Sequence, residues 1–344
     1  MKSTIDLVEA GWIPDPLIRL GIRRLLKQRL KDEAARYENP EAKAEFIRSM
    51  TEAPVAMETQ AANDQHYELP PEFFELCLGA RRKYSSAYWP EGVRNLDEAE
   101  EAMLALTCER AGLEDGQEVL ELGCGWGSLS LWMAEKYPNS RIHGVSNSAD
   151  QRRSIEARAQ ARGLTNLRIE TCDMNRFEAA NGHYDRMVSV EMFEHMRNWT
   201  ELLGRVKTWL KPSGQAFLHV FTHREYAYPF QDQDESDWMS RYFFTGGMMP
   251  SDDLLHVLPS PFDVDRHWVV DGRHYGKTAR AWLQNLDHNQ EPAMQILRQH
   301  YSADQAPLWF RRWRMFFMAC EELWNYAGGR EWLVSHYRLK PSEV

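Results

Sequence analysis

Short apolar runs alternate with helix-length segments along the middle of the chain. The runs that we predict to be β-strands are 118–122, 141–145, 167–170, 185–190 and 215–220. The intervening segments that we predict to be helices are 128–137, 151–162 and 199–210. Strands that alternate with helices of this length form βαβ units, whose strands lie parallel in one sheet. The pattern therefore predicts an α/β fold built on a doubly wound, mostly parallel sheet.

The regions on either side of this alternation have a different pattern. Residues 1–108 have mostly helical spacing, and residues 223–344 are rich in aromatic side chains and also favour helix. We therefore predict three regions along the chain. They are N-terminal helices over 1–108, a ligand-binding core over 109–222, and a C-terminal insertion over 223–344 that covers the ligand crevice.

One N-terminal segment, 17–31, combines apolar residues at near-helical spacing with six basic residues and no acidic one. Such a helix can pack on its own protein or on a second subunit, because an apolar stripe is usually buried. It can also lie on an anionic membrane surface. We favour packing, including packing in a homodimer, and keep peripheral membrane contact as the alternative.

Composition narrows the class of protein. The 344 residues carry a formal net charge of −10, which argues against a dedicated nucleic-acid binder, since such a protein needs clustered positive charge. No stretch approaches the roughly 18 to 20 apolar residues of a membrane-spanning helix. The five cysteines are scattered, without a C-x-x-C motif, which predicts neither a disulfide framework nor a metal site. We expect a cytoplasmic protein.

The strongest single motif is a glycine-rich loop after the first predicted strand, Val119-Leu-Glu-Leu-Gly-Cys-Gly-Trp-Gly127. Open α/β sheets bind ligands at this edge, and glycines let a ligand approach the main chain. Glu121 precedes Gly123 by two residues, so it can face a cationic ligand such as the α-amino group of S-adenosylmethionine. A pyrophosphate would be repelled by this carboxylate.

The next two strands offer further ligand contacts. The second ends in Val145-Ser-Asn-Ser148, without the carboxylate that commonly binds a ribose, so Asn147 and Gln151 are the candidate ribose ligands. Asp173, after the third strand, can accept a hydrogen bond from an adenine amino group. The alternative for Asp173 is a helix cap or a turn residue.

Two carboxylates and an imidazole follow the fourth strand. If a helical turn begins there, Glu191, Glu194 and His195 fall at i, i+3 and i+4 and share one face. Such proximity raises the pKa of one carboxyl and favours protonation of His195. The cluster could take a proton from an acceptor or hold a cationic one. The alternative is a solvated helix start, where acidic residues are favoured by the helix dipole.

Five runs in order along the chain also carry a family resemblance. They are 65–70, 83–89, 121–127, 191–195 and 242–247. Together they resemble the cyclopropane fatty acid synthase superfamily of S-adenosylmethionine-dependent methyltransferases, and most closely its coclaurine N-methyltransferase-like branch. The resemblance implies a Rossmann-like class I methyltransferase core with a seven-stranded sheet. It implies S-adenosylmethionine as cofactor and S-adenosylhomocysteine as product.

Residue roles follow from the resemblance, motif by motif. The residues that would bind the cofactor are Tyr84, Ser85, Gly123, Gly125, Asn147, Gln151, Asp173 and Met174. Those that would surround the acceptor are Tyr67, Ser86, Tyr88, His223 and Tyr275. The run 191–195 would shape an amine pocket and assist deprotonation.

Two departures separate this chain from the lipid-cyclopropanating members that it resembles. Those members have a cysteine where this chain has Ser86, and a glycine where it has Glu191. Conversely, Glu194, His223 and Tyr275 match positions that frame a bound bicarbonate in the lipid enzymes. Bicarbonate therefore stays a secondary candidate.

The combined analysis predicts an S-adenosylmethionine-dependent N-methyltransferase acting on a small amine. The neutral nitrogen would attack the methyl group in line, after His195, positioned by Glu191 or Glu194, has removed the ammonium proton. The main alternative is methylation or cyclopropanation of an unsaturated lipid acyl chain. A third hypothesis is a cofactor-binding interaction protein without catalysis.

Overall fold

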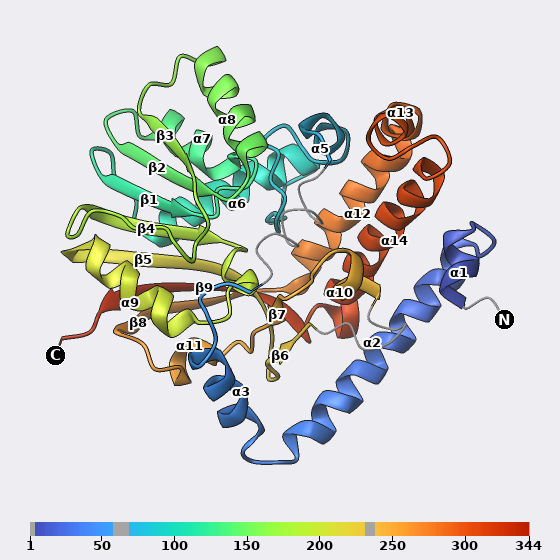
Figure 1. The fold of residues 1–344 in the computed structure, drawn as a ribbon, viewed down its shortest axis with the longest axis horizontal. Coiled ribbons are helices and arrows are strands. Elements are labelled where there is room, and N and C mark those ends of the chain that lie inside the picture. The colour runs from blue at the N-terminus through green and yellow to red at the C-terminus, as the bar shows by residue number, and fades with distance from the viewer. Residues whose placement is uncertain (1–3, 58–68, 231–237, 344) are drawn as a thin grey trace.

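A seven-stranded sheet lies at the centre of the computed structural model, which describes residues 4–57, 69–230 and 238–343 (Figure 1). The strand order is β3-β2-β1-β4-β5-β9-β8. Its strands are β1 (Glu118–Leu122), β2 (Arg141–Ser146), β3 (Leu167–Thr171), β4 (Tyr184–Val190), β5 (Leu210–His223), β8 (Phe262–Val270) and β9 (Trp332–Pro341). A separate two-stranded sheet pairs β6 (Tyr228–Pro229) with β7 (Met248–Met249).

The strands β1 to β5 run parallel to one another, as the alternating sequence pattern predicts. The strand β9 is antiparallel to both of its neighbours, β5 and β8. The sheet is thus mixed but mostly parallel, which confirms the predicted fold class. Because β8 and β9 come from the region 223–344, this region adds two strands to the sheet.

Helices pack on both faces of the sheet and form a second mass beside it (Figure 1). Those in the N-terminal third are α1 (Thr4–Glu9), α2 (Asp15–Tyr37), α3 (Ala42–Thr51), α5 (Pro71–Cys77) and α6 (Leu96–Ala111). Those among the first five strands are α7 (Ser128–Lys136), α8 (Ala149–Ala161), the short 3₁₀ helix η1 (Phe193–His195) and α9 (Trp199–Trp209). The remainder are α10 (Trp238–Tyr242), α11 (Leu254–Val257), α12 (Gly272–His288), α13 (Gln290–His300), α14 (Ala306–Asn325) and η3 (Tyr326–Gly328).

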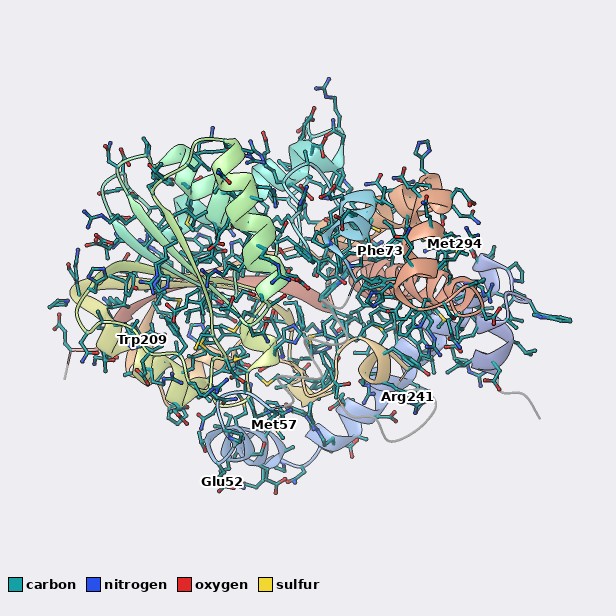
Figure 2. All side chains as sticks on the ribbon, turned by 45° about the horizontal axis from the view of Figure 1, so that its top comes forward. Glu52, Met57, Phe73, Trp209, Arg241 and Met294 are labelled. Atoms are coloured by element: carbon teal, nitrogen blue, oxygen red, sulfur yellow. The ribbon has the colours of Figure 1, made fainter. Side chains whose placement is uncertain are left out.

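Two large apolar clusters hold these layers together (Figure 2). The first lies between the N-terminal helices and α12–α14, where Phe73 and Met294 are labelled. The second lies against the sheet and α9, where Trp209 is labelled. Methyl and aromatic groups buried in this way supply the main favourable free energy of folding.

The basic N-terminal segment forms α2, which packs along α14 (Figure 1). Ile18, Ile22 and Leu26 contact the first apolar cluster. On the same helix, the Arg19 guanidinium donates hydrogen bonds to Glu321 at 2.7 Å and to the neighbouring Glu322 at 2.8 Å. The helix α2 therefore packs on its own chain, which is the first of the two interpretations of this segment. None of the helices within the described ranges is long and apolar enough to cross a membrane.

Candidate active site

The glycine-rich loop between β1 and α7 opens into a cavity, which we call the loop cavity. Gly123 and Gly125 have φ values of +80° and +51°, a region that L side chains rarely adopt. A Cβ atom on Gly123 would overlap the Met192 side chain, whereas one on Gly125 would meet no atom within 4 Å. Gly125 therefore leaves open space beside the loop.

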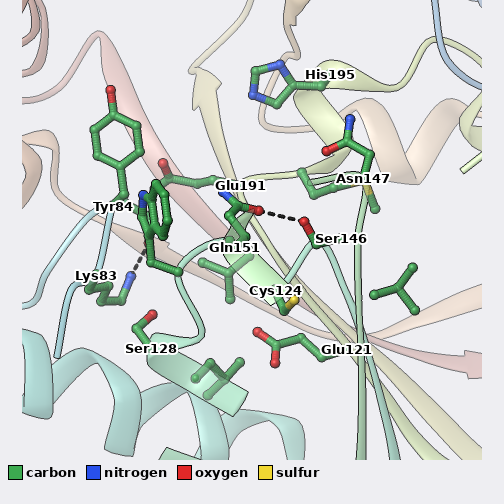
Figure 3. Close-up of a pocket in the computed structure, with 18 of the residues that line it drawn as sticks. Lys83, Tyr84, Glu121, Cys124, Ser128, Ser146, Asn147, Gln151, Glu191 and His195 are labelled. Carbon is green, nitrogen blue, oxygen red and sulfur yellow. Dashed lines mark hydrogen bonds between the residues drawn. The ribbon is translucent and has the colours of Figure 1, made fainter. Parts of the chain in front are cut away.

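The polar lining of the loop cavity matches much of the predicted cofactor site (Figure 3). The predicted cofactor ligands that line it are Tyr84, Ser85, Glu121, Gly123, Gly125, Asn147, Gln151 and Met174. The Ser146 hydroxyl donates a hydrogen bond of 2.6 Å to Gln151 Oε1, while the buried Gln151 Nε2 has no partner among the described residues. A buried amide donor without a partner is costly, so it fits a ligand that brings an acceptor.

Glu121 lies deep in the loop cavity, at the opposite end from His195 (Figure 3). Its carboxylate accepts a hydrogen bond from Ser130, and burial raises the pKa of the carboxyl to about 7. A cationic group entering the cavity would stabilise the ionised form of Glu121. These residues fit S-adenosylmethionine, whose amino and sulfonium groups are positive and whose ribose can accept a hydrogen bond from Gln151.

Asp173 does not line the loop cavity, although its neighbours Cys172 and Met174 do. Its Oδ1 accepts a hydrogen bond of 2.8 Å from the Asn175 amide, and its carbonyl accepts from Arg176 and Phe177. This geometry is that of a turn residue, the alternative considered for it. The adenine contact predicted for Asp173 stays a prediction.

A second cavity, of about 480 Å³, adjoins the first, and we call it the aromatic cavity. Its volume lies in the range of sites for small organic ligands. Side chains from α2, α10, α12 and α14 line it, and aromatic rings dominate. The rings are Tyr84, Phe221, Tyr228, Phe230, Trp238, Phe244, Tyr275, Trp282, Phe316, Trp324 and Trp332. Tyr84, Glu191 and His195 line both cavities, so these three side chains stand at their junction.

Glu191 has an unusual backbone conformation at this junction. Its φ is +48°, in the left-handed region that costs a non-glycine residue about 1 kcal/mol. The lipid enzymes that the sequence resembles have glycine here. The carboxylate lies at the junction, where it accepts hydrogen bonds from Ser86 N at 2.8 Å and from the Tyr275 hydroxyl at 2.7 Å. His219 Nε2 lies 3.1 Å from Glu191 Oε1.

The charges around Glu191 decide which groups are protonated. Burial raises the pKa of the Glu191 carboxyl, and the Lys83 ammonium and the hydrogen bonds from Ser86 and Tyr275 oppose this shift. Burial lowers the pKa of Lys83 to about 8. Burial also lowers the pKa of His195 to about 4, against the attraction of Glu191. The raised carboxyl pKa matches the sequence prediction, but the predicted protonation of His195 is wrong because desolvation outweighs the nearby charge.

The expected helical arrangement of the acidic run is also wrong. Glu191 precedes the 3₁₀ turn η1 and has left-handed φ, so Glu191, Glu194 and His195 do not share one helix face. Glu194 is buried away from both cavities and accepts a hydrogen bond of 2.6 Å from Phe221 N. Burial and the charge of Glu191 raise its pKa well above the ordinary value. Glu194 therefore lines neither cavity, and its carboxylate contacts the backbone of β5 next to the site.

The predicted acceptor ligands are only partly brought together. Tyr275 lines the aromatic cavity, and Ser86 contributes its backbone amide to Glu191. Tyr88 and His223 line neither cavity; His223 Nδ1 accepts hydrogen bonds from two backbone amides of its own loop. Tyr67 lies outside the described residues. Because Tyr275 donates to Glu191, a donor that the resemblance assigned to bicarbonate is already used by a carboxylate of the chain.

The sequence analysis missed two residues beside Glu191, namely Lys83 and His219. Lys83 is the first residue of the run 83–89. A lysine is usually exposed, and only the structure shows that this one is buried. His219 lies inside the apolar run of β5. A histidine among buried apolar residues was the feature of the sequence that could have indicated a role for it. No group of three or more possible metal ligands occurs within the part of the chain that the structure describes.

Comparison with known proteins extends these observations. The family model for mycolic acid cyclopropane synthetase matches residues 56–327. (S)-Coclaurine N-methyltransferase from Thalictrum flavum subsp. glaucum is 35% identical over 339 residues, which cover 97% of this chain and 94% of that protein. The crystal structure of coclaurine N-methyltransferase bound to N-methylheliamine and SAH has a TM-score of 0.90 at 33% identity, with 97% of each chain covered. Cyclopropane-fatty-acyl-phospholipid synthase from Escherichia coli (strain K12) is 33% identical over 224 residues, which cover 64% of this chain and 55% of that protein.

A glycine loop that follows the first strand of a seven-stranded sheet and opens into a cavity is where class I methyltransferases bind S-adenosylmethionine. The fold, the cavity and the relatives define this chain as an S-adenosylmethionine-dependent methyltransferase. The chain belongs to the mycolic acid cyclopropane synthetase family.

Gly125→Ala tests whether the open space beside the loop is used by the cofactor. Its new Cβ would project into the loop cavity, so we expect affinity for S-adenosylhomocysteine to fall about tenfold, measured by calorimetry. Gly163→Ala is the matched control, because Gly163 also has positive φ and open space but lies outside the cavity. Both variants should lose similar thermal stability; equal affinity in both would contradict the assignment.

Proposed function

We propose that this methyltransferase transfers a methyl group to the nitrogen of an amine whose apolar body fills the aromatic cavity. The observation that carries the proposal is the junction, where Glu191 and His195 face both the loop cavity and the aromatic cavity. The N-methyltransferase relatives, which align over almost the whole chain, support an amine as acceptor. Aromatic faces also attract cations, so the lining suits a protonated amine.

An amine with a pKa near 9 or 10 is mostly protonated at neutral pH and has no free electron pair. S-Adenosylmethionine, when bound, supplies an electrophilic methyl group. The protein must therefore remove one proton from the ammonium and hold the nitrogen in line with that group. The side chains at the junction are Tyr84, Glu191 and His195.

The pKa directions favour Glu191 over His195 as the proton acceptor. A neutral His195 with a pKa near 4 is a weak base. Burial raises the pKa of the Glu191 carboxyl and so brings it closer to the pKa of the amine. In our proposal, Glu191 attracts the ammonium and takes its proton. His195 accepts a hydrogen bond from the amine and orients its electron pair. Its ring is held parallel to that of Phe244, 5.8 Å away.

The lipid alternative has less support from the same geometry. In the lipid enzymes, as the resemblance implies, a bound bicarbonate acts as base above a glycine. Here a strained glutamate accepts the hydrogen bonds from Tyr275 and Ser86 instead.

Glu191→Gln and His195→Ala separate the two roles. The amide cannot take a proton, so we expect Glu191→Gln to lower kcat/KM for tetrahydroisoquinoline roughly 100-fold or more. His195→Ala should lower it about tenfold, the scale of one lost orienting hydrogen bond. Methyl transfer is measured by mass spectrometry, and S-adenosylhomocysteine affinity is measured in both variants as well, because both side chains also line the loop cavity. A larger loss for His195→Ala than for Glu191→Gln would return the base assignment to His195.

Chemical rescue of Glu191→Gly gives a complementary test. Glycine relieves the left-handed backbone and leaves the Tyr275, Ser86 and His219 hydrogen-bond donors around an empty space. We expect formate or bicarbonate to restore measurable methyl transfer to Glu191→Gly in a saturable manner. Glu191→Gln, in which the amide occupies that space, is the control that anions should leave inactive. Absence of rescue by both anions would contradict the carboxylate role.

A further inference from the structure

A line of hydrogen bonds runs from the Glu191 carboxylate through the sheet to helix α6. His219 Nε2 lies 3.1 Å from Glu191 Oε1, and His219 Nδ1 lies 2.9 Å from His336 Nε2. His336 Nδ1 in turn lies 2.9 Å from the Arg110 guanidinium. The two histidines are directly paired across β5 and β9, and both side chains are fully buried. Two buried imidazoles in series are expensive unless each ring nitrogen has a partner.

The arginine fixes the direction of every hydrogen bond in this line. A guanidinium has only donors and stays protonated, so His336 Nδ1 must accept from Arg110. A neutral His336 then carries its proton on Nε2 and donates to His219 Nδ1. By the same reasoning, His219 carries its proton on Nε2 and donates to Glu191 Oε1.

Both rings are kept neutral by their surroundings. Burial lowers the pKa of His219 and of His336 well below the ordinary value, and the charges of Lys83 and Arg110 act in the same direction. A neutral ring has one donor and one acceptor, which is the condition for a line with a single direction. The line therefore points hydrogen-bond donors inward, toward Glu191.

We infer that Arg110 and His336 are positioning residues, which act through His219 to hold Glu191 as an ionised carboxylate. This inference rests on the proposed role of Glu191 as proton acceptor. If Arg110 is removed, His336 Nδ1 no longer has to accept, and both rings can adopt the opposite tautomer. His219 would then present a lone pair to Glu191, which favours the protonated carboxyl that cannot take a proton from the amine.

Other groups also face Glu191, and the test must separate their effects from that of the line. Lys83 and Tyr275 favour its ionised form, the charges of Glu194 and Glu191 repel each other, and the neutral His195 ring also faces it. The charge of Glu191 also raises the pKa of the Cys320 thiol. None of these five residues is hydrogen-bonded to Arg110 in the structure as described, so they stay in place when Arg110 is changed.

The chain provides a matched control for Arg110. Arg110 lies over the Trp268 ring at 5.1 Å, and Arg338 lies near the same ring at 6.0 Å. Arg338 pairs with Asp265 at 2.7 Å and has no hydrogen bond to His336. Arg338→Met therefore removes the same charge from the same surface without breaking the line.

The experiment measures kcat/KM for tetrahydroisoquinoline as a function of pH. Protonation of Glu191 stops proton uptake, so the rate falls as pH drops through the Glu191 pKa. We expect Arg110→Met to move this acid limb upward by about one pH unit, the scale of one weakened hydrogen bond to a charged group. Arg338→Met should leave it in place, and Arg110→Lys, which keeps a donor, should restore it. An unmoved limb in Arg110→Met, or equal shifts in both methionine variants, would overturn the inference.

Histidine side-chain ¹⁵N spectra test the same inference without turnover. We expect His219 and His336 to be neutral with the proton on Nε2, and His219→Gln and His336→Gln assign the two signals. A charged ring, or a proton on Nδ1 of His336, would overturn the line even if Glu191→Gln abolishes activity. Full activity of Glu191→Gln, with the predicted tautomers present, would instead contradict the proposed function.

Discussion

A buried carboxylate must be surrounded by donors and positive charge, and Glu191 imposes this constraint on the whole site. Its side chain is only 7% exposed, and its backbone is held in a left-handed conformation. The groups that satisfy it come from three distant parts of the chain: Ser86 and Lys83 before the sheet, His219 on β5, and Tyr275 on α12. The environment of this carboxylate therefore depends on packing of the N- and C-terminal regions on the core.

The same constraint explains why the added regions are integrated with the core. The α12 helix lines the aromatic cavity and also supplies the Tyr275 hydroxyl to Glu191. The last strand, β9, completes the sheet and places His336 beside His219. One carboxylate therefore accepts hydrogen bonds from donors in several elements, and one of those elements also lines the acceptor cavity.

The parallel half of the fold and the cofactor cavity could be predicted from the sequence, because both depend on local patterns. The first predicted strand, 118–122, coincides with β1, and Glu121, Gly125 and Gln151 line the loop cavity as expected. Contacts between distant segments could not be predicted in this way. The charged residues of β8 and the mixed residues of β9 concealed two strands, and no local pattern distinguishes a turn residue from a ligand at Asp173. The low pKa of His195 depends on burial, which no residue spacing reveals.

The central claim is that Glu191 removes a proton from the acceptor before methyl transfer, and a series of amines of decreasing pKa tests it most directly. The rates of the unchanged protein and of Glu191→Gln are compared at one pH for acceptors of similar shape. Proton removal is unnecessary for an amine whose pKa lies below the assay pH. The account predicts that the deficit of Glu191→Gln shrinks steadily along the series and nearly vanishes for such an amine. A deficit of constant size for every acceptor would contradict it, because the carboxylate would then serve binding or alignment alone.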